Sequence, residues 1–271
     1  MEFVIEISLF LDRLPLADSK QEEELIDYIT KRVLEELCRV NQYYGFGNEG
    51  RKRLREIYSD LIAALRRYEG AAGKTDLKNL SDLHYKRLRQ LVEDTNSFAT
   101  EVYSSDQEMA GSVPCSEYSP DLQINLFRLN VDNLDKPLLD IGCGKLANLV
   151  NYLREKDIEA YGIDRFARDN QFCETADWLE FDYGTERWGT IISNLGFSNH
   201  FMNHHLRKDG NYIEYTRVYM AILNSLKPFG SFYYTPDLPF IEMHLDKEKY
   251  NLHKFDTGMH NFKAVRITRT G

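Results

Sequence analysis

The first hundred residues carry apolar side chains at the three- and four-residue spacing of amphipathic helices. One such helix is predicted over residues 21–40 and another over 54–65. A third is predicted over 76–103, with Asp76 or Ser81 as its N-cap. This part of the chain therefore predicts a helical region without a sheet.

The pattern changes near Pro137, where short apolar runs alternate with amphipathic stretches. The runs predicted as strands are 138–141, 160–163, 172–176, 190–193, 231–235, 250–256 and 262–268. Helices are predicted at 122–129, 146–155 and 211–226, and a turn is predicted at 227–230. Such alternation predicts a mostly parallel sheet with helices on both faces, and the closing pair of strands predicts an antiparallel strand at one edge.

Together the two patterns predict a helical cap region, residues 1–115, followed by an α/β domain, residues 116–271. The boundary falls in a stretch rich in Ser, Gly and Pro, residues 104–120, which is typical of a linker. With 42% hydrophobic and 13% aromatic residues, the chain has enough apolar side chains for a packed core.

Charge and cysteine content limit the classes of partner. The formal net charge of −9 opposes contact with phosphate backbones, so nucleic acid is not the predicted partner. The four cysteines form no Cys-x-x-Cys pair, and no metal site is predicted. The first residues are acidic where a signal peptide is basic, and no apolar run is long enough to span a bilayer. We therefore expect a cytoplasmic protein without a membrane partner.

The clearest candidate chemistry lies in the segment DIGCG, residues 140–144, where a predicted strand ends in a glycine turn before a helix. Glycines allow a tight turn and a close approach to a ligand, and the helix start offers free N–H groups. A second acid, Asp164, follows about twenty residues later at the end of the next predicted strand, where a carboxylate can reach ribose hydroxyls. Strand, turn, helix and acid in this register predict a site for an adenosine cofactor.

The charge of Asp140 distinguishes between such cofactors. Gly142, Gly144 and Ala147 also satisfy the loose dinucleotide fingerprint, which seats an anionic pyrophosphate. A carboxylate two residues before the first glycine opposes an anion and attracts a cation. S-adenosylmethionine carries a sulfonium and an ammonium group, so Asp140 favours it over a nicotinamide dinucleotide.

Residues 138–165, LLDIGCGKLANLVNYLREKDIEAYGIDR, resemble the first two motifs of class I S-adenosylmethionine-dependent methyltransferases. Residues 176–178, 186–201, 223–234 and 262–268 resemble later motifs of that family in the expected order. The resemblance covers about the last half of the chain. It implies an α/β, Rossmann-like methyltransferase fold, with a mostly parallel seven-stranded sheet and an antiparallel edge strand.

The resemblance also implies which residues bind the cofactor, S-adenosyl-L-methionine. These residues are Asp140, Gly142, Cys143, Gly144, Asp164, Arg165, Asp177, Trp178 and Asn194. In the family pattern, the first acid, the glycine turn and Asn194 border the methionine moiety, Asp164 holds the ribose, and the others contact adenine. Two positions depart from the pattern, because Leu146 and Phe229 stand where glycine is usual.

Methyl transfer chiefly requires that donor and acceptor be aligned and water excluded, and it needs a base only if the acceptor must lose a proton. Two histidines after the fourth predicted strand, His200 and His204, are the candidate catalytic bases. Their alternative interpretation is as polar residues of a loop or helix start. Spaced four apart they could also bind a metal, but no carboxylate partner accompanies them.

The acceptor is predicted to be a small molecule methylated on O, N or C, with the helical region covering its pocket. The sequence Asn194-Leu195-Gly196-Phe197 is not the Asn/Asp-Pro-Pro-Tyr/Phe sequence of enzymes that methylate adenine. The basic run at residues 51–55 is typical of a solvated helix face. An RNA or protein methyltransferase and a catalytically silent binding module are the alternatives, and the sequence predicts no oligomeric state.

Overall fold

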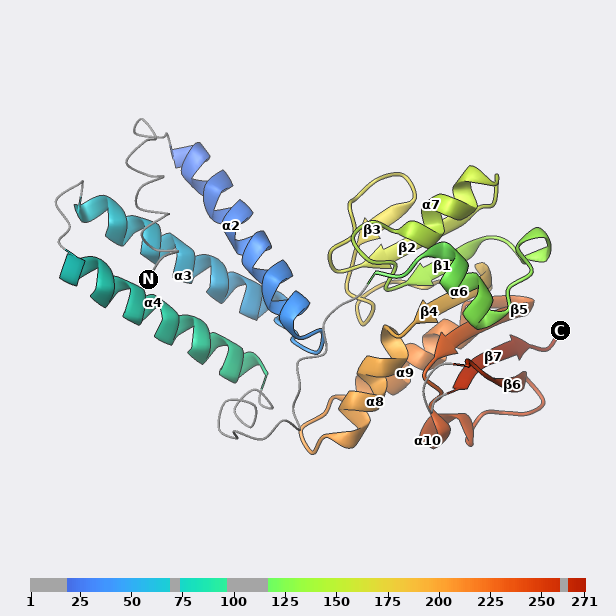
Figure 1. Ribbon diagram of the computed structural model, residues 1–271. Coiled ribbons are helices and arrows are strands. Elements are labelled where there is room, and N and C mark those ends of the chain that lie inside the picture. Colours follow the sequence, from blue (N-terminus) through green and yellow to red (C-terminus); the bar gives the residue numbers. More distant parts are fainter. Residues whose placement is uncertain (1–18, 69–73, 97–116, 259–262) are drawn as a thin grey trace. The chain divides into compact units, whose positions relative to one another are not determined.

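The computed structural model describes residues 19–68, 74–96, 117–258 and 263–271. The chain separates into two compact units, Met1–Cys115 and Ser116–Gly271 (Figure 1). Most of the predicted linker lies outside the described residues. Within the described ranges, no helix combines the length and the apolar character needed to cross a bilayer.

The described residues of the first unit form three helices: α2 (Ser19–Val40), α3 (Gly47–Tyr68) and α4 (Lys74–Thr95). The predicted amphipathic stretches are therefore helical, but the predicted N-caps of the third helix are wrong. Because α4 begins at Lys74, both Asp76 and Ser81 lie inside it, and Ser81 is buried. The predicted continuation of this helix towards residue 103 lies outside the described residues.

The basic run lies on α3, where its arginines form ion pairs with neighbouring helices. Arg53 contacts Asp94 of α4 at 2.6 Å, and Arg55 contacts Asp27 of α2 at 2.7 Å. All four side chains are exposed, so each pair contributes little to stability. These pairs agree with a solvated helix face, although the acids lie on α2 and α4 and not within α3.

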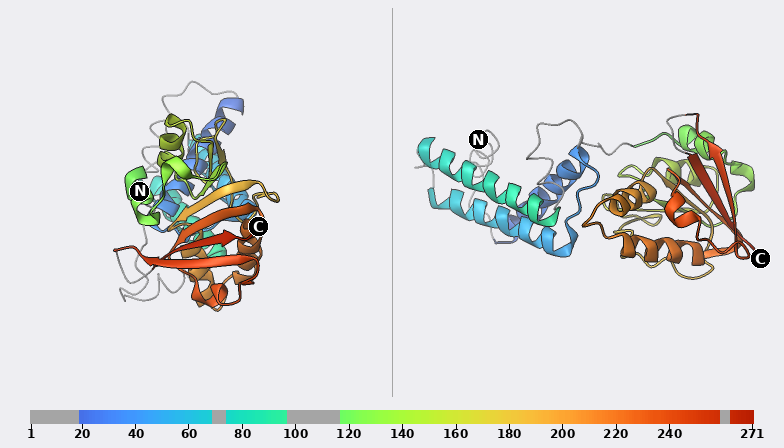
Figure 2. Two further views of the ribbon diagram at one scale, coloured as in Figure 1. Left: turned by 90° about the vertical axis from the view of Figure 1, so that its right-hand side faces the viewer. Right: turned by 90° about the horizontal axis from the view of Figure 1, so that it is seen from below.

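The second unit contains a seven-stranded sheet with the order β3-β2-β1-β4-β5-β7-β6. Its strands are β1 (Leu138–Ile141), β2 (Ala160–Asp164), β3 (Cys173–Thr175), β4 (Trp188–Asn194), β5 (Leu226–Thr235), β6 (Tyr250–Asp256) and β7 (Lys263–Arg269). The first five run parallel, and β7 is antiparallel to both β5 and β6. The hairpin of β6 and β7, drawn in red in Figure 2, closes one edge. This arrangement confirms the predicted Rossmann-like methyltransferase fold.

Helices cover both faces of the sheet, as Figure 1 shows. On one face, α6 (Pro120–Phe127) and α7 (Asn148–Glu155) pack on apolar residues of β1 and β2. On the other face, α8 (Phe197–Leu206) and α9 (Tyr212–Asn224) bury Phe197, Phe201, Tyr215 and Tyr219 against β4, β5 and β7. A 3₁₀ turn, η2 (Val131–Asn133), precedes β1, and a short helix, α10 (Pro239–Glu242), follows β5. These helices fix the positions of the strand ends on which the site is built.

One predicted turn lies inside a strand. Residues 227–230 belong to β5, which pairs with β4 at Leu226 and again from Ser231. The residues between them bulge out of register, and Phe229, which is 68% exposed, adopts a left-handed conformation with φ 65°. The departure from glycine at this position is thus accommodated by a bulge that points to solvent.

Candidate active site

The candidate site lies at the carboxyl ends of β1, β2, β3 and β4. These strands are parallel neighbours, so their carboxyl ends meet at one edge of the sheet, where open α/β sheets bind ligands. The turn after β1 carries Gly142 and Gly144, and β2 ends at Asp164. Asn194 ends β4. The structure therefore places these predicted site residues along a single edge.

The glycine turn is held in place by Asp164. Gly142 and Gly144 have φ values of +81° and +76°, a region that favours glycine. One carboxylate oxygen of Asp164 accepts the N–H of Gly144 at 3.3 Å, and the other accepts the N–H of Phe166 at 2.8 Å. Gly142 itself donates to the carbonyl of Ile163 at 2.8 Å. Asp164 thus joins the end of β2 to the turn after β1.

Asp140 is a buried acid without a hydrogen-bond donor among the described residues. Its side chain is only 2% exposed, on a strand flanked by β2 and β4. Burial, reinforced by the charge of Asp164, raises the pKa of Asp140 to about 8. Buried polar groups are normally paired, so an uncompensated carboxyl group at a strand end points to a ligand that supplies the partner.

Asn194, on the neighbouring strand β4, is also a buried polar residue whose side chain lacks a hydrogen-bond partner among the described residues. Its side chain is 8% exposed, and neither its amide oxygen nor its amide nitrogen has a hydrogen-bond partner among the described residues. The adjacent backbone is fixed, because Ser193 donates to the carbonyl of Ile141 at 2.9 Å and Leu195 donates to Thr235 at 2.9 Å. One donor and one acceptor are therefore held ready beside the glycine turn.

Glu117 also lies at the candidate site, although no motif in the sequence indicates it. Its carboxylate accepts the N–H groups of Lys145 (2.9 Å) and Leu146 (3.3 Å), directly after the glycine turn. A Cβ added to Gly144 would lie 3.2 Å from Cγ of Glu117. Its charge also helps to raise the pKa of Asp164, after the larger effect of burial. Three carboxyl groups thus surround one turn, which favours a cationic ligand.

Trp178 covers the glycine turn. A Cβ placed on Gly142 would lie 3.4 Å from the indole ring, and one placed on Gly196, after β4, would lie 3.6 Å from it. The indole packs edge-on against Phe197, with ring centres 6.4 Å apart, and against His200 at 4.9 Å. Gly196 therefore allows the indole to lie close to the ends of β1 and β4. The sequence motifs do not indicate this glycine as a site residue.

The other two predicted adenine contacts lie near the ends of β2 and β3. Arg165 is half-buried, and its guanidinium lies 5.3 Å from the ring centre of Phe166. Asp177 is exposed, and one of its carboxylate oxygens accepts the N–H of Leu179 at 2.9 Å. Burial raises the pKa of Tyr215, and the charges of Asp177 and Arg165 also act on it. Tyr215 packs in the same core cluster as Trp178, so Arg165 and Asp177 both border that cluster.

The two candidate bases lie on α8 in different environments. His200 is 5% exposed, and burial, with the nearby charge of Arg165, lowers its pKa well below 6.5. His204 is half-buried and stacks on Tyr215, and burial and the charge of Arg207 lower its pKa to about 4. Nδ1 of His204 accepts the backbone N–H of Asn211 at 3.0 Å, so its proton resides on Nε2. Both imidazoles are therefore neutral near pH 7.

We expect nitrogen NMR of histidine-labelled protein to show His204 with an unprotonated Nδ1 and a protonated Nε2. Because its pKa is about 4, its ring should stay neutral as the pH falls from 8 to 5, and His200 should do the same. His204→Gln and His200→Gln variants assign the two signals. A ring that becomes charged near pH 6.5 in either position would contradict the burial described above.

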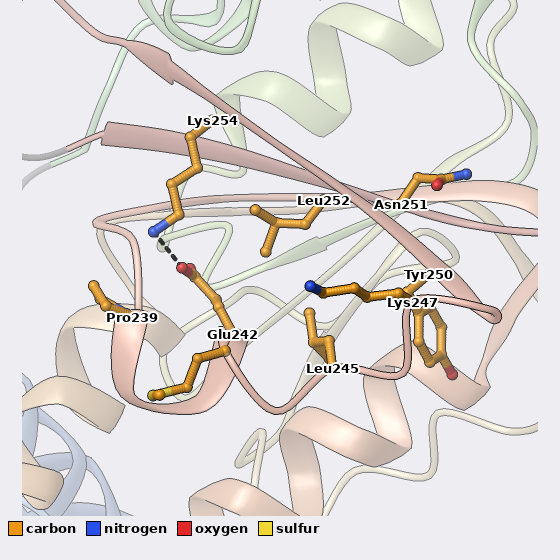
Figure 3. A pocket seen from close by; sticks show the side chains of 9 residues that line it. Pro239, Glu242, Leu245, Lys247, Tyr250, Asn251, Leu252 and Lys254 are labelled. Carbon is orange, nitrogen blue, oxygen red and sulfur yellow. Dashed lines mark ion pairs between the residues drawn. The ribbon is translucent and has the colours of Figure 1, made fainter.

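A separate pocket of about 580 Å³ lies between α10 and the edge strand β6 (Figure 3). Lys254 and Glu242 point towards each other across it and form an ion pair of 2.5 Å, and Lys254 also contacts Asp237 at 2.8 Å. Glu242 is buried and accepts hydrogen bonds from the Tyr234 hydroxyl and the Leu238 N–H, both at 2.6 Å. The charges here satisfy one another, which is typical of a structural ion-pair cluster.

The described residues contain no group of three or more His, Cys, Asp or Glu side chains that could hold a metal ion. His200 and His204, the pair considered for a metal, interact with different groups: His200 packs on Trp178, and His204 accepts a backbone N–H. The strand ends bring together carboxylates, an amide and an indole.

Solved structures similar to this chain include a putative S-adenosylmethionine-dependent methyltransferase from Listeria monocytogenes, at 12% identity and a TM-score of 0.38, covering 56% of this chain and 99% of the other. A TehB-like S-adenosylmethionine-dependent methyltransferase from Corynebacterium glutamicum is 14% identical, with a TM-score of 0.39 and coverage of 64% and 96%. A methyltransferase from Bacteroides fragilis in complex with S-adenosyl-L-homocysteine is 13% identical, with a TM-score of 0.38 and coverage of 56% and 81%. No family model and no curated protein sequence matches the chain.

Proposed function

We propose that the second unit binds S-adenosylmethionine and transfers its methyl group to a small molecule. The observation that carries the proposal is the buried carboxyl group of Asp140, which lacks a described donor and lies beside the glycine turn and near Asp164. An anion such as pyrophosphate would add a further negative charge to this group of acids. A ligand with a sulfonium and an ammonium group would compensate them.

Each site residue has a proposed task. Asp140 loses its proton when a cation approaches, and Asn194 offers one donor and one acceptor to the amino-acid end of the ligand. Asp164 holds the glycine turn and directs its remaining lone pairs to the ribose hydroxyls. Trp178, with Arg165 and Asp177, borders the adenine. When bound, S-adenosylmethionine supplies an activated methyl group.

We propose different tasks for the two histidines. His200, next to Trp178, accepts the proton that a hydroxyl acceptor releases once it has gained the methyl group. A weakly basic imidazole suffices for this, because an alkylated oxonium centre is strongly acidic. His204 positions the loop after α8, because its Nδ1 accepts the backbone N–H of Asn211. In the same loop, Gly210 has no room for a side chain, because a Cβ there would overlap the carbonyl of His204.

The acceptor class rests on charge. The net charge of −9 opposes contact with phosphate backbones, and Arg53 and Arg55 of the basic run on α3 are paired with acids of α4 and α2. We therefore propose a small molecule as acceptor, with RNA or protein as the alternative. A catalytically silent binding module is the second alternative.

The first test is calorimetry of the full chain with S-adenosylmethionine and, as a matched nucleotide control, with NAD⁺. We expect saturable heat with the sulfonium ligand and none with the dinucleotide. Binding of NAD⁺ in preference to S-adenosylmethionine, or heat from neither, would overturn the proposed cofactor.

The acceptor is then tested with methyl-labelled S-adenosylmethionine in a cell extract separated into small molecules, RNA and protein. We expect the label in the small-molecule fraction and only when the protein is present. Label that is lost on nuclease or protease treatment would replace the small molecule by RNA or protein. Binding without transfer to any fraction would favour the silent module.

A further inference from the structure

Two cysteine side chains meet beside the glycine turn. Cys173 opens β3, and its register partner on β2 is Gly162. A Cβ added to Gly162 would lie 2.8 Å from Sγ of Cys143. The sulfur of Cys143 therefore occupies the space that a side chain at Gly162 would fill, and register partners direct their side chains to the same face of a sheet. The Cys143 thiol donates to the carbonyl of Gly144 at 3.5 Å, and the Cys173 side chain lies beside it, on the same face of the neighbouring strand.

The surroundings shift the pKa values of the two thiols in opposite directions. Both cysteines are free, Cys173 is buried, and Cys143 is half-buried. The neighbouring Cys143 thiol lowers the pKa of Cys173, with further help from the amide of Asn170 and the guanidinium of Arg154. The neighbouring Cys173 thiol, together with burial, raises the pKa of Cys143. A thiol of lowered pKa beside a second thiol is the arrangement that reacts readily with oxidants.

We propose that Cys143 and Cys173 form a reversible dithiol–disulfide site for small two-electron oxidants, represented by hydrogen peroxide. Cys173 attacks a peroxide oxygen as the thiolate. The O–O bond breaks, the leaving hydroxide takes up a proton, and Cys173 becomes a sulfenic acid. The Cys143 sulfur then displaces hydroxide from the sulfenic acid and forms the S–S bond, and the Cys143 proton passes to that hydroxide. Overall, two thiols lose two electrons and two protons, and peroxide becomes two waters.

The disulfide would tie the glycine turn to β3. Cys143 lies between Gly142 and Gly144, and its backbone N–H donates to Ile163 at 3.2 Å. The S–S bond draws the Cys143 sulfur out of its place above Gly162, so the turn must shift with it. The expected weakening of cofactor binding rests on the proposed function, whereas the disulfide itself does not.

The test uses a Cys38→Ser, Cys115→Ser variant, which keeps only the proposed pair, and a matched control with Cys143→Ser added. After treatment with hydrogen peroxide, mass spectrometry should show the two peptides joined by a disulfide that a reductant reverses. The control should instead give a sulfenic acid at Cys173 that is trapped by dimedone. The same peptide mapping on the unsubstituted chain covers the case in which the variants do not fold. Oxidation of each sulfur separately, without the cross-link, would overturn the proposal.

Calorimetry with S-adenosylhomocysteine completes the test on reduced and oxidised protein. We expect the affinity to fall at least about tenfold on oxidation and to return on reduction. A complete cross-link with unchanged affinity would overturn the proposed effect on the turn. Failure of the reduced protein to bind would overturn the proposed function and leave the dithiol chemistry standing, so the two failures are distinguishable.

Discussion

Replacing Asp140 by Asn is expected to weaken binding of S-adenosylmethionine by about 100-fold and, at the same time, to stabilise the protein. The lost affinity reflects a cation that loses its buried counter-charge, an effect of about 2–5 kcal/mol. The gained stability arises because a buried carboxyl group is costly to ionise. Its pKa of about 8 exceeds the unfolded value, so the free energy of unfolding falls as the pH rises from about 4 to 8. Asparagine cannot ionise, so this fall in the free energy of unfolding with rising pH disappears.

Calorimetry and urea unfolding at several pH values measure both effects. In the unsubstituted protein, the affinity should rise about tenfold per pH unit below pH 8, because binding requires the ionised carboxylate. The pH dependence should disappear in Asp140→Asn, whose free energy of unfolding at pH 8 should be at least about 2 kcal/mol higher. The control is Asp132→Asn in η2, an exposed position with the same change of charge. Equal losses of affinity in both variants would contradict a specific role for Asp140.

Replacing Glu242 by Ala is expected to lower the free energy of unfolding by about 3 kcal/mol. The change leaves the Tyr234 hydroxyl and the Leu238 N–H without their acceptor, and it removes one of the two carboxylates paired with Lys254. The remaining partner, Asp237, keeps the charge of Lys254 compensated. The decrease in the free energy of unfolding should therefore not exceed that caused by breaking a buried ion pair.

Urea unfolding measures the loss, and Glu242→Gln separates its causes. Glutamine keeps an acceptor for the two short hydrogen bonds and loses the charge, so its free energy of unfolding should lie between those of the alanine variant and the unsubstituted protein. Glu248→Ala, at an exposed position in the loop that follows α10, should change stability by less than about 0.5 kcal/mol. A loss below about 1 kcal/mol in Glu242→Ala would show that the ion-pair cluster is not stabilising.

The strands of the second unit could be predicted because their signals are local. The strands β1, β2 and β4 contain short apolar runs bounded by polar residues or glycine, and β1 begins and ends at the predicted residues. Helix α8 was missed because its sequence, FSNHFMNHHL, has few apolar residues, and its buried phenylalanines, Phe197 and Phe201, are separated by polar ones. Helix α10 has only four residues, too few to display a period.

The site was predictable to the extent that its residues follow one another along the strands. Asp140 and Asp164 were selected by spacing, and both lie at the predicted strand ends. Glu117 could not be selected, because its contacts with the turn after β1 join residues that are far apart in sequence and arise in a stretch without periodicity. The proximity of Cys143 to Cys173 depends on the β2–β3 register, which no single-sequence pattern specifies.

The order of the site residues along the chain bears on how such a protein can diversify. All the side chains proposed to hold the methyl donor fall between Glu117 and Asn194, whereas β5, β6 and β7 contribute framework and the separate ion-pair cluster. Insertions or exchanges in the loops that follow β5 can therefore accumulate during evolution while the donor machinery is inherited intact. Laboratory recombination of this C-terminal portion offers a corresponding route to new acceptors.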